Sequence, residues 1–253
     1  MKGRLDTRPV PLQTAILLMP AVFGLAVLVA PAIGALGLVW LAEFAIIEPV
    51  CFGLPALVAA RATTGSVRGA LALSRPTRRA LAGALLFGGT FWYLNATLIA
   101  PLLAEHTSAS DRALAGALAD QMPLALEVLV LAVIPAVCEE LLVRGAIARG
   151  IAARLGPVAG VLLSSAYFAL LHLSLARALP TAVLGAALAI VVLCTGSLVP
   201  AMLIHALNNT AALLLGDPSM SAAVDLLARH PLAALFASSI GSLAGLFLLL
   251  RRR

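Results

Sequence analysis

The sequence predicts an all-α polytopic membrane protein with about eight transmembrane helices. Of its 253 residues, 62% are hydrophobic and only 11% are charged, and its mean hydropathy is +1.08. A soluble domain is about half apolar and a quarter charged, so we expect the bilayer to be the solvent. The apolar runs are continuous rather than alternating, which indicates helices, since only helices or closed barrels satisfy the backbone in lipid. They fill most of the chain, and we therefore expect a single membrane domain over residues 1–253.

A helix needs roughly 20 apolar residues to cross the hydrocarbon core. The runs of approximately this length are Pro11–Ala30, Ala35–Ala59, Ala80–Ala104, Pro123–Val143, Pro157–Leu175, Leu179–Cys194, Leu198–Leu215 and Leu232–Leu250. Proline, glycine and charged clusters mark the breaks between them. The sixth run is short, and we expect it to be tilted or partly covered by its neighbours. The segment Asp111–Asp120 is typical of a short amphipathic helix at the outer surface.

The positive charges are distributed as the positive-inside rule requires. With the N-terminus in the cytoplasm, eight spans place fourteen of the seventeen Lys and Arg residues at the inner side, and only Arg112, Arg177 and Arg229 outside. We therefore predict that both termini are cytoplasmic and that the net charge of +6 encodes topology, with no nucleic-acid partner. Richness in Ala, Leu, Gly and Arg suggests a multi-pass protein of a bacterial inner (plasma) membrane.

Ionisable side chains within these runs are costly to insert, so they usually face the protein interior and have a function. The polar residues in or near the predicted spans are Glu43, Glu48, Glu127, Glu139, Glu140, His172, His205 and Asn209. Residues four apart share a helix face, which lets Glu140 pair with Arg144. Glu139 is rotated from Glu140 by about 100°, so the two carboxylates are expected in different environments.

Three helices can each direct polar groups toward one cavity. Glu139 and Glu140 lie on the first of these helices. The second carries Phe168 and His172, and the third carries His205 and Asn209, with a spacing of four residues in both pairs. A carboxylate can activate water as a general base, a nearby imidazole can orient that water, and an amide with a second imidazole can stabilise an oxyanion. The alternative is zinc held by Glu139, His172 and His205, although the chain lacks a two-histidine helical pair such as HExxH. The predicted chemistry is hydrolysis, with no cofactor unless zinc is bound.

These motifs carry a resemblance to a known family. The chain has EExxxR at residues 139–144, FxxxH at 168–172 and HxxxN at 205–209. In this order they resemble the motifs of the CPBP family, the CAAX-protease and bacteriocin-processing group. The resemblance covers roughly residues 123–215, which we expect to form the motif-bearing core, and all three motifs are intact.

The resemblance implies an eight-helix intramembrane endopeptidase acting on membrane-tethered peptides or proteins. It implies that Glu139 activates water with help from His172, while His205 and Asn209 stabilise the oxyanion. Members were long described as metalloproteases, and a glutamate-activated water is the mechanism we expect. The residues in supporting positions are Glu140, Arg144 and Phe168.

Two other functions remain as alternatives. Such proteins can act as non-enzymatic scaffolds that regulate a partner. A small proton-coupled transporter is the third candidate, in which Glu43 and Glu48 would line a path, although we detect no inverted repeat. Glu127 is a candidate for a supporting position behind the motif.

The predicted boundaries create one conflict. They place Glu139 near the cytoplasmic end of its helix and His172 nearer the outer end of the next, which is too far apart for a catalytic pair. Helix tilt, a longer fourth helix or a later start of the fifth helix would each remove the conflict, and residues 145–156 also have a helical pattern.

Overall fold

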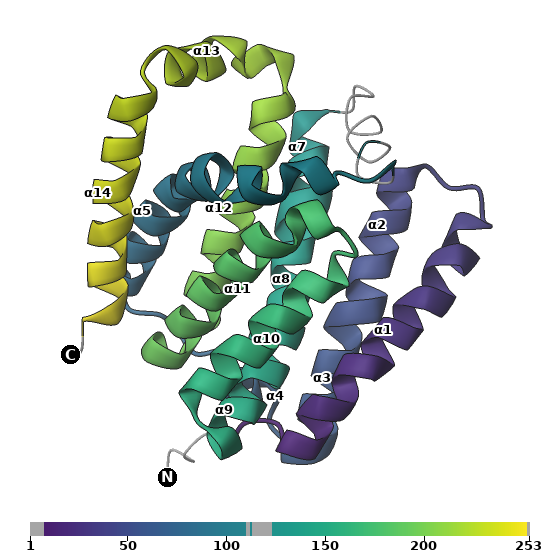
Figure 1. Cartoon of the computed structure of the whole chain (residues 1–253). Coiled ribbons are helices and arrows are strands. Elements are labelled where there is room, and N and C mark those ends of the chain that lie inside the picture. The colour runs from purple at the N-terminus through teal and green to yellow at the C-terminus, as the bar shows by residue number, and fades with distance from the viewer. Residues whose placement is uncertain (1–7, 110–111, 113–122, 252–253) are drawn as a thin grey trace.

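The computed structural model describes residues 8–109, 112 and 123–251. These residues form helices and connecting loops, with no strand among them (Figure 1). The predicted all-α fold is confirmed. The surface helix predicted at 111–120 lies outside the described residues, apart from Arg112.

The first half of the chain contributes α1 and two long composite helices. The elements are α1 (Leu12–Gly34), α2 (Trp40–Glu48), η1 (Pro49–Gly53), α3 (Leu54–Thr64), α4 (Val67–Ala70), α5 (Arg78–Leu94), η2 (Asn95–Ile99) and η3 (Ala100–His106). The stretches from α2 to α3 and from α5 to η3 are each continuous.

The second half begins with one long helix that changes its winding several times. Its elements, followed by the remaining helices, are α7 (Leu124–Glu127), η4 (Val128–Val133), α8 (Ile134–Glu140), η5 (Leu141–Ala148), α9 (Arg149–Leu155), α10 (Pro157–Leu171), α11 (Leu175–Thr195), α12 (Val199–Gly216), η6 (Pro218–Met220), α13 (Ser221–Arg229) and α14 (Pro231–Leu250). Here η4 and η5 are π-helical, and they flank the α8 segment that ends in the two motif glutamates.

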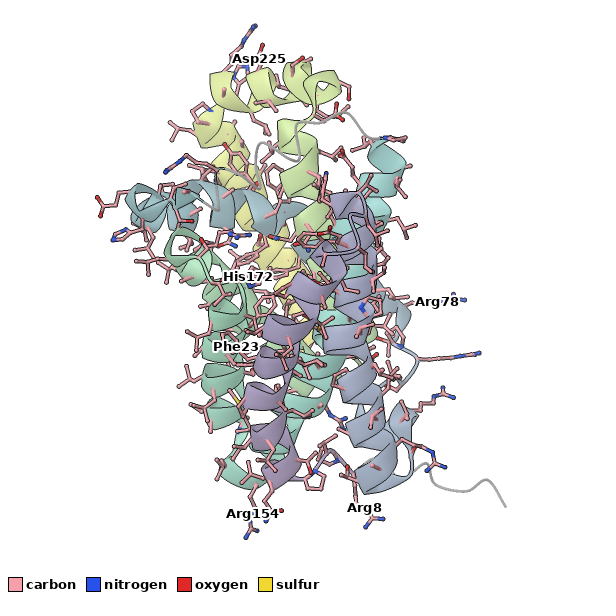
Figure 2. All side chains as sticks on the ribbon, turned by 90° about the vertical axis from the view of Figure 1, so that its right-hand side faces the viewer. Arg8, Phe23, Arg78, Arg154, His172 and Asp225 are labelled. Atoms are coloured by element: carbon pink, nitrogen blue, oxygen red, sulfur yellow. The ribbon has the colours of Figure 1, made fainter. Side chains whose placement is uncertain are left out.

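Five helices of the described residues are long and apolar enough to cross a membrane, and α10 and α12 are shorter apolar helices. The chain is a multi-pass integral membrane protein, while the count of eight and the cytoplasmic termini stay predictions. In Figure 2, Arg8 and Arg154 lie at one end of the bundle and Asp225 at the other. The two arginines, which the sequence predicted at the same inner side, thus lie together in the structure.

Two predicted boundaries were wrong. The fourth helix does not end near Val143 but continues to Leu155, because Arg144 is not a loop residue: its side chain is buried within the bundle. The sixth helix is not short, since α11 begins at Leu175 and has 21 residues. Ser174 begins it, and the Ser174 hydroxyl accepts a hydrogen bond from the Arg177 N–H at 3.2 Å, an N-cap that hydropathy does not reveal.

Small residues bring α5 and α14 into close contact. A Cβ on Gly83 would lie 2.9 Å from the Gly245 carbonyl oxygen, and a Cβ on Gly245 would lie 2.6 Å from the Phe87 nitrogen. The Thr90 and Ser242 hydroxyls also share a hydrogen bond of 3.0 Å. Close backbone approach and polar contacts are the usual means of helix association in lipid. The packing holds α5 in place, and η2 continues directly from it.

Candidate active site

A one-residue turn places the first two motifs at the same depth. Gly156 has a φ of 90°, a backbone conformation that glycine adopts without strain, and Pro157 begins α10 directly after it. Glu139 precedes the end of α9 by sixteen residues, and His172 follows the start of α10 by fifteen. At 1.5 Å per residue these stretches are about 24 and 22 Å long. Since α10 packs back against α9 and η5, the predicted conflict disappears.

Glu140 and Arg144 form an ion pair in the interior. Arg144 Nη1 donates to Glu140 Oε1 at 2.6 Å, and both side chains are fully buried. The Arg144 guanidinium also lies over the Phe168 ring, 4.1 Å from its centroid. Truncating one member of such a pair leaves an uncompensated charge. The predicted pairing is confirmed, and Phe168 covers it.

Gly185 of α11 makes room for this ion pair. A Cβ at this position would lie 3.1 Å from Arg144 Nη2 and 3.3 Å from Phe168 Cδ1. A larger side chain would therefore press on both groups. No sequence pattern predicts this contact, because Gly185 belongs to none of the three motifs.

His205 of α12 joins the two carboxylates. Its Nδ1 lies 3.0 Å from Glu140 Oε1, and its Nε2 lies 3.5 Å from Glu139 Oε2. The His205 ring also meets Phe168 edge to face, with centroids 5.6 Å apart. The three motifs thus meet in one contiguous cluster, although they come from three different helices.

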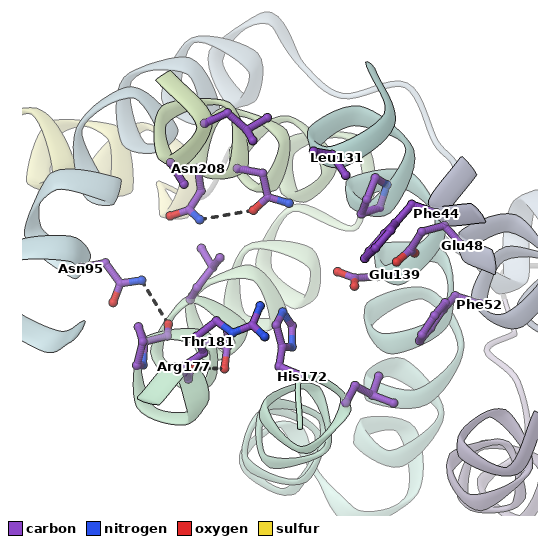
Figure 3. A pocket seen from close by; sticks show the side chains of 17 residues that line it. Phe44, Glu48, Phe52, Asn95, Leu131, Glu139, His172, Arg177, Thr181 and Asn208 are labelled. Carbon is purple, nitrogen blue, oxygen red and sulfur yellow. Dashed lines mark hydrogen bonds between the residues drawn. The ribbon is translucent and has the colours of Figure 1, made fainter. Parts of the chain in front are cut away.

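Glu139 differs from Glu140 in facing a cavity. The cavity has a volume of about 560 Å³ and includes both Glu139 and His172 in its wall. Figure 3 shows Glu139, His172 and Glu48 directed into this common space. The lining residues are Phe44, Glu48, Phe52, Asn95, Leu131, Pro135, Glu139, Leu171, His172, Arg177, Pro180, Thr181, Leu184, Asn208, Asn209, Ala212 and Leu213.

The ring of His172 is held by its own helix. Its Nδ1 lies 2.9 Å from the Phe168 carbonyl oxygen, and the Phe168 ring meets it edge to face at 4.9 Å between centroids. A carbonyl oxygen only accepts, so Nδ1 carries the proton, and in the neutral imidazole Nε2 is the acceptor. The four-residue spacing of FxxxH therefore sets both the orientation and the tautomer of His172.

The structure separates the two members of the third motif. Asn209 lines the cavity with Glu139 and His172, whereas His205 is buried and is not among the lining residues. Both ring nitrogens of His205 face carboxylate oxygens. The sequence predicted that His205 and Asn209 act together at an oxyanion, and of the two only Asn209 reaches the cavity wall.

Several cavity residues lie outside the motifs. Glu48 has an exposed fraction of 6%, and its Oε2 is buried without a hydrogen-bond partner among the described residues. The charge of Glu48 within an apolar run indicated a function, but no feature of the sequence predicted that Glu48 lies beside Glu139. Glu43 and Glu127 do not line the cavity, so the predicted path through Glu43 and the predicted support from Glu127 find no counterpart in this site.

The zinc alternative has little geometric support. Among the residues that the structure describes, no group of three His, Cys, Asp or Glu side chains is arranged to hold a metal ion. The contacts of His172 Nδ1 with a carbonyl and of His205 Nδ1 with Glu140 do not themselves exclude a metal, since a metal-bound imidazole usually makes such a contact through its other nitrogen. Of the suggested ligands, however, only Glu139 and His172 line the cavity, while His205 is buried, so the three do not converge on one ion in this arrangement.

The motifs and the cavity define a candidate hydrolase site within a membrane domain. Residues 121–211 match the family model described as Type II CAAX prenyl endopeptidase Rce1-like. The match covers a little over a third of the chain and contains all three motifs. It confirms the predicted resemblance to the CPBP family and indicates, at the level of the family, a CAAX-type intramembrane peptidase with membrane-associated peptide substrates. No curated protein and no solved structure matches the chain.

Proposed function

We propose that this protein is an intramembrane endopeptidase that hydrolyses a membrane-tethered peptide or protein by means of a water activated by Glu139. The observation that carries the proposal is that Glu139 and His172, from neighbouring helices, line one cavity of about 560 Å³ at the same depth. Pockets that bury a drug-sized ligand have volumes of about 300–1,000 Å³, so a cavity of this size has room for a short stretch of extended peptide.

In the proposed mechanism, Glu139 takes a proton from a water molecule as general base. The water oxygen attacks the scissile carbonyl carbon, and the carbonyl oxygen becomes an oxyanion. His172 orients the water through Nε2, because its Nδ1 is bound to the Phe168 carbonyl. The oxyanion then collapses to a carbonyl, the C–N bond breaks, and Glu139 returns the proton to the nitrogen of the leaving amine. No proton is therefore gained or lost by the protein over the cycle.

Asn209 is the proposed donor to the oxyanion. Its side chain lines the cavity, and an amide N–H aimed at a developing negative charge is worth most where water is scarce. We assign His205 to orienting Glu139 rather than to the oxyanion, since its Nε2 lies 3.5 Å from Glu139 Oε2. Glu140 holds the other nitrogen of the His205 ring, and Arg144 compensates the charge of Glu140.

The proposed substrate is a peptide or protein anchored in the same membrane, and the proposed location is a bacterial inner membrane. The family name points to prenylated CAAX proteins, which a bacterium would seldom offer. Peptides and proteins with a C-terminal membrane anchor have the matching chemistry, because their cleavage site can enter a cavity within the bilayer while the anchor stays in lipid.

A comparison of protein termini tests the proposal. Cells that produce the native protein, Glu139→Gln or Glu43→Gln are compared by mass spectrometry of the N- and C-terminal peptides of their membrane proteins. Glu43→Gln is the matched control, since it makes the same chemical change on a residue outside the cavity. We expect at least one protein to carry a new terminus in the native and Glu43→Gln strains and to stay uncut with Glu139→Gln.

The other outcomes discriminate between functions. Identical termini in all three strains, together with the loss of a bound partner in the Glu139→Gln strain, would favour the scaffold. Purified native protein in detergent should also cut the identified substrate in the presence of a chelator. Loss of that cleavage, with recovery on adding zinc, would contradict the glutamate mechanism.

A further inference from the structure

Asn95 is a buried amide at a helical junction beside the cavity. It is the first residue of η2, directly after α5, and its exposed fraction is 6%. A polar side chain in a membrane-spanning helix is costly unless it is satisfied or used. No sequence pattern indicates a role for Asn95, because it lies outside the three motifs and outside the segment that matches the family model.

Only half of the Asn95 amide has a partner. Its Nδ2 donates to the Pro180 carbonyl oxygen of α11 at 3.1 Å. Its Oδ1 is buried and has no hydrogen-bond partner among the described residues. Leaving a buried acceptor unpaired is unfavourable, and a link between two helices would need the donor alone. The spare acceptor therefore points to a ligand that donates a hydrogen bond.

Two cavities meet at this amide. The large cavity contains Glu139, and a smaller one of about 110 Å³ shares four of its lining residues, including Asn95 and Asn208. The smaller cavity extends to Ala96, which is exposed on the outside of the bundle, and to Ala100 of η3. Because they share these residues, the two cavities adjoin at Asn95, and together their linings include Glu139 at one end and the exposed Ala96 at the other.

Amide side chains line the two adjoining cavities between Asn95 and the candidate active site. Asn208 borders both cavities, and its Nδ2 lies 3.4 Å from the Oδ1 of Asn209, the proposed oxyanion donor. Figure 3 shows Asn95 and Asn208 on the side of the cavity away from Glu139 and Glu48. An amide offers both donors and acceptors, as does each peptide unit of an extended chain.

We propose that Asn95, with Asn208, forms a subsite that binds the main chain of the substrate peptide several residues from the scissile bond. In this subsite Asn95 Oδ1 accepts a hydrogen bond from a substrate backbone N–H, while Nδ2 keeps the amide oriented through Pro180. Recognition of the main chain tolerates many side-chain sequences. The proposal rests on the proposed endopeptidase function and extends it to how the peptide is positioned.

Substrate length provides the test. Two synthetic peptides span the cleavage site found by the comparison of termini: a long one of about twelve residues, and a short one cut back to the residues next to the scissile bond on the side that Asn95 would bind. Purified native protein and the Asn95→Leu variant are assayed with both. We expect the drop in kcat/KM caused by Asn95→Leu to be about tenfold larger for the long peptide than for the short one, and to come mainly from KM.

A purely structural role of Asn95 would lower kcat/KM by the same factor for both peptides, and that result would overturn the subsite. Thr97→Val is the matched control, because Thr97 lies on the same η2 turn but bonds to the Tyr93 carbonyl of its own helix. Its effect should not depend on peptide length. If Asn95→Leu does not fold, Asn208→Leu serves in its place with the same expected dependence on length.

The peptide assays distinguish a failure of the subsite from a failure of the proposed function. If the native protein cuts both peptides but neither the Asn95 nor the Asn208 variant discriminates by length, the subsite is wrong and the endopeptidase stands. If the native protein cuts neither peptide, the endopeptidase is wrong and the subsite falls with it.

Discussion

Glu139 and Glu140 are adjacent in the chain, yet the structure gives them opposite surroundings. Glu140 is fully buried, bonded to Arg144 at 2.6 Å and close to His205 at 3.0 Å. Glu139 faces a cavity, with a contact of 3.5 Å to His205 as its nearest ion pair. One helical step of about 100° separates a paired carboxylate from one that remains available for chemistry.

The side chains around the two glutamates differ as well. The cluster around Glu140 consists of complementary charges beneath the Phe168 ring, and a buried group of this kind costs stability when one member is removed. The region around Glu139 contains Glu48, a second acid whose Oε2 is buried without a partner. Unpartnered buried atoms occur in both regions, since Glu140 Oε2 and the Nε and Nη2 of Arg144 also lack a hydrogen-bond partner among the described residues. The regions differ in that Glu139 and Glu48 line the cavity, whereas Glu140 and Arg144 do not.

The largest expected effect distinguishes the two glutamates by activity. Glu139→Gln should lower turnover of the identified substrate by between about 10²- and 10⁴-fold, the usual contribution of a general base, while thermal stability in detergent stays close to native. Glu140→Gln should instead lower the unfolding temperature, because it leaves Arg144 without its anionic partner. Full turnover by Glu139→Gln would show that the two regions have been assigned the wrong way round.

The next effect concerns stability. Arg144→Met should destabilise the protein by about 3–5 kcal/mol, since it leaves the Glu140 charge uncompensated in the interior. The double variant Glu140→Gln/Arg144→Met should lose less than the sum of the single variants. Chemical denaturation in detergent, followed by tryptophan fluorescence, measures all three. Strict additivity would mean that the 2.6 Å contact contributes no coupling.

A smaller effect of opposite sign is expected at Glu48. Glu48→Met removes a buried carboxyl with an unpartnered oxygen and should stabilise the protein by about 1–3 kcal/mol. Turnover should not rise with stability, because sites used for function often carry such a cost. The unfolding temperature is the measurement, and a clear decrease would show that Glu48 contributes to holding the fold.

The smallest effect is expected at Glu43, five residues before Glu48. It is half-buried and lies outside the cavity, so Glu43→Gln should change stability by less than about 0.5 kcal/mol, the usual range for substitutions away from a packed core or a charge network. It should also leave turnover within twofold of native. Kinetics and thermal unfolding on the same preparation check both. A large loss of turnover would extend the active region beyond the cavity and revive the predicted path through Glu43 and Glu48.

The sequence by itself determined the membrane class, the helical content and the identity of the motif residues. Composition imposes a bilayer as solvent, and lipid then imposes helices. The local spacing of four residues was sufficient to predict the pairing of Glu140 with Arg144, and the same spacing in FxxxH accounts for the bond between His172 and the Phe168 carbonyl. These contacts lie within one helix, so the helical period alone decides them.

Only the tertiary structure decided the depth of the site, the roles available to the two histidines, and the inclusion of Glu48 and Asn95. The hydropathy pattern predicted that the fourth helix ends near Arg144, because the sequence does not distinguish a buried arginine from a loop arginine until its partner is known. The turn at Gly156, the capped start of α11 at Ser174 and the approach of α12 to α8 then set which side chains meet. Such contacts join residues from 24 positions apart (Arg144 and Phe168) to 85 positions apart (Asn95 and Pro180). They depend on helix ends and packing that a periodic pattern does not encode.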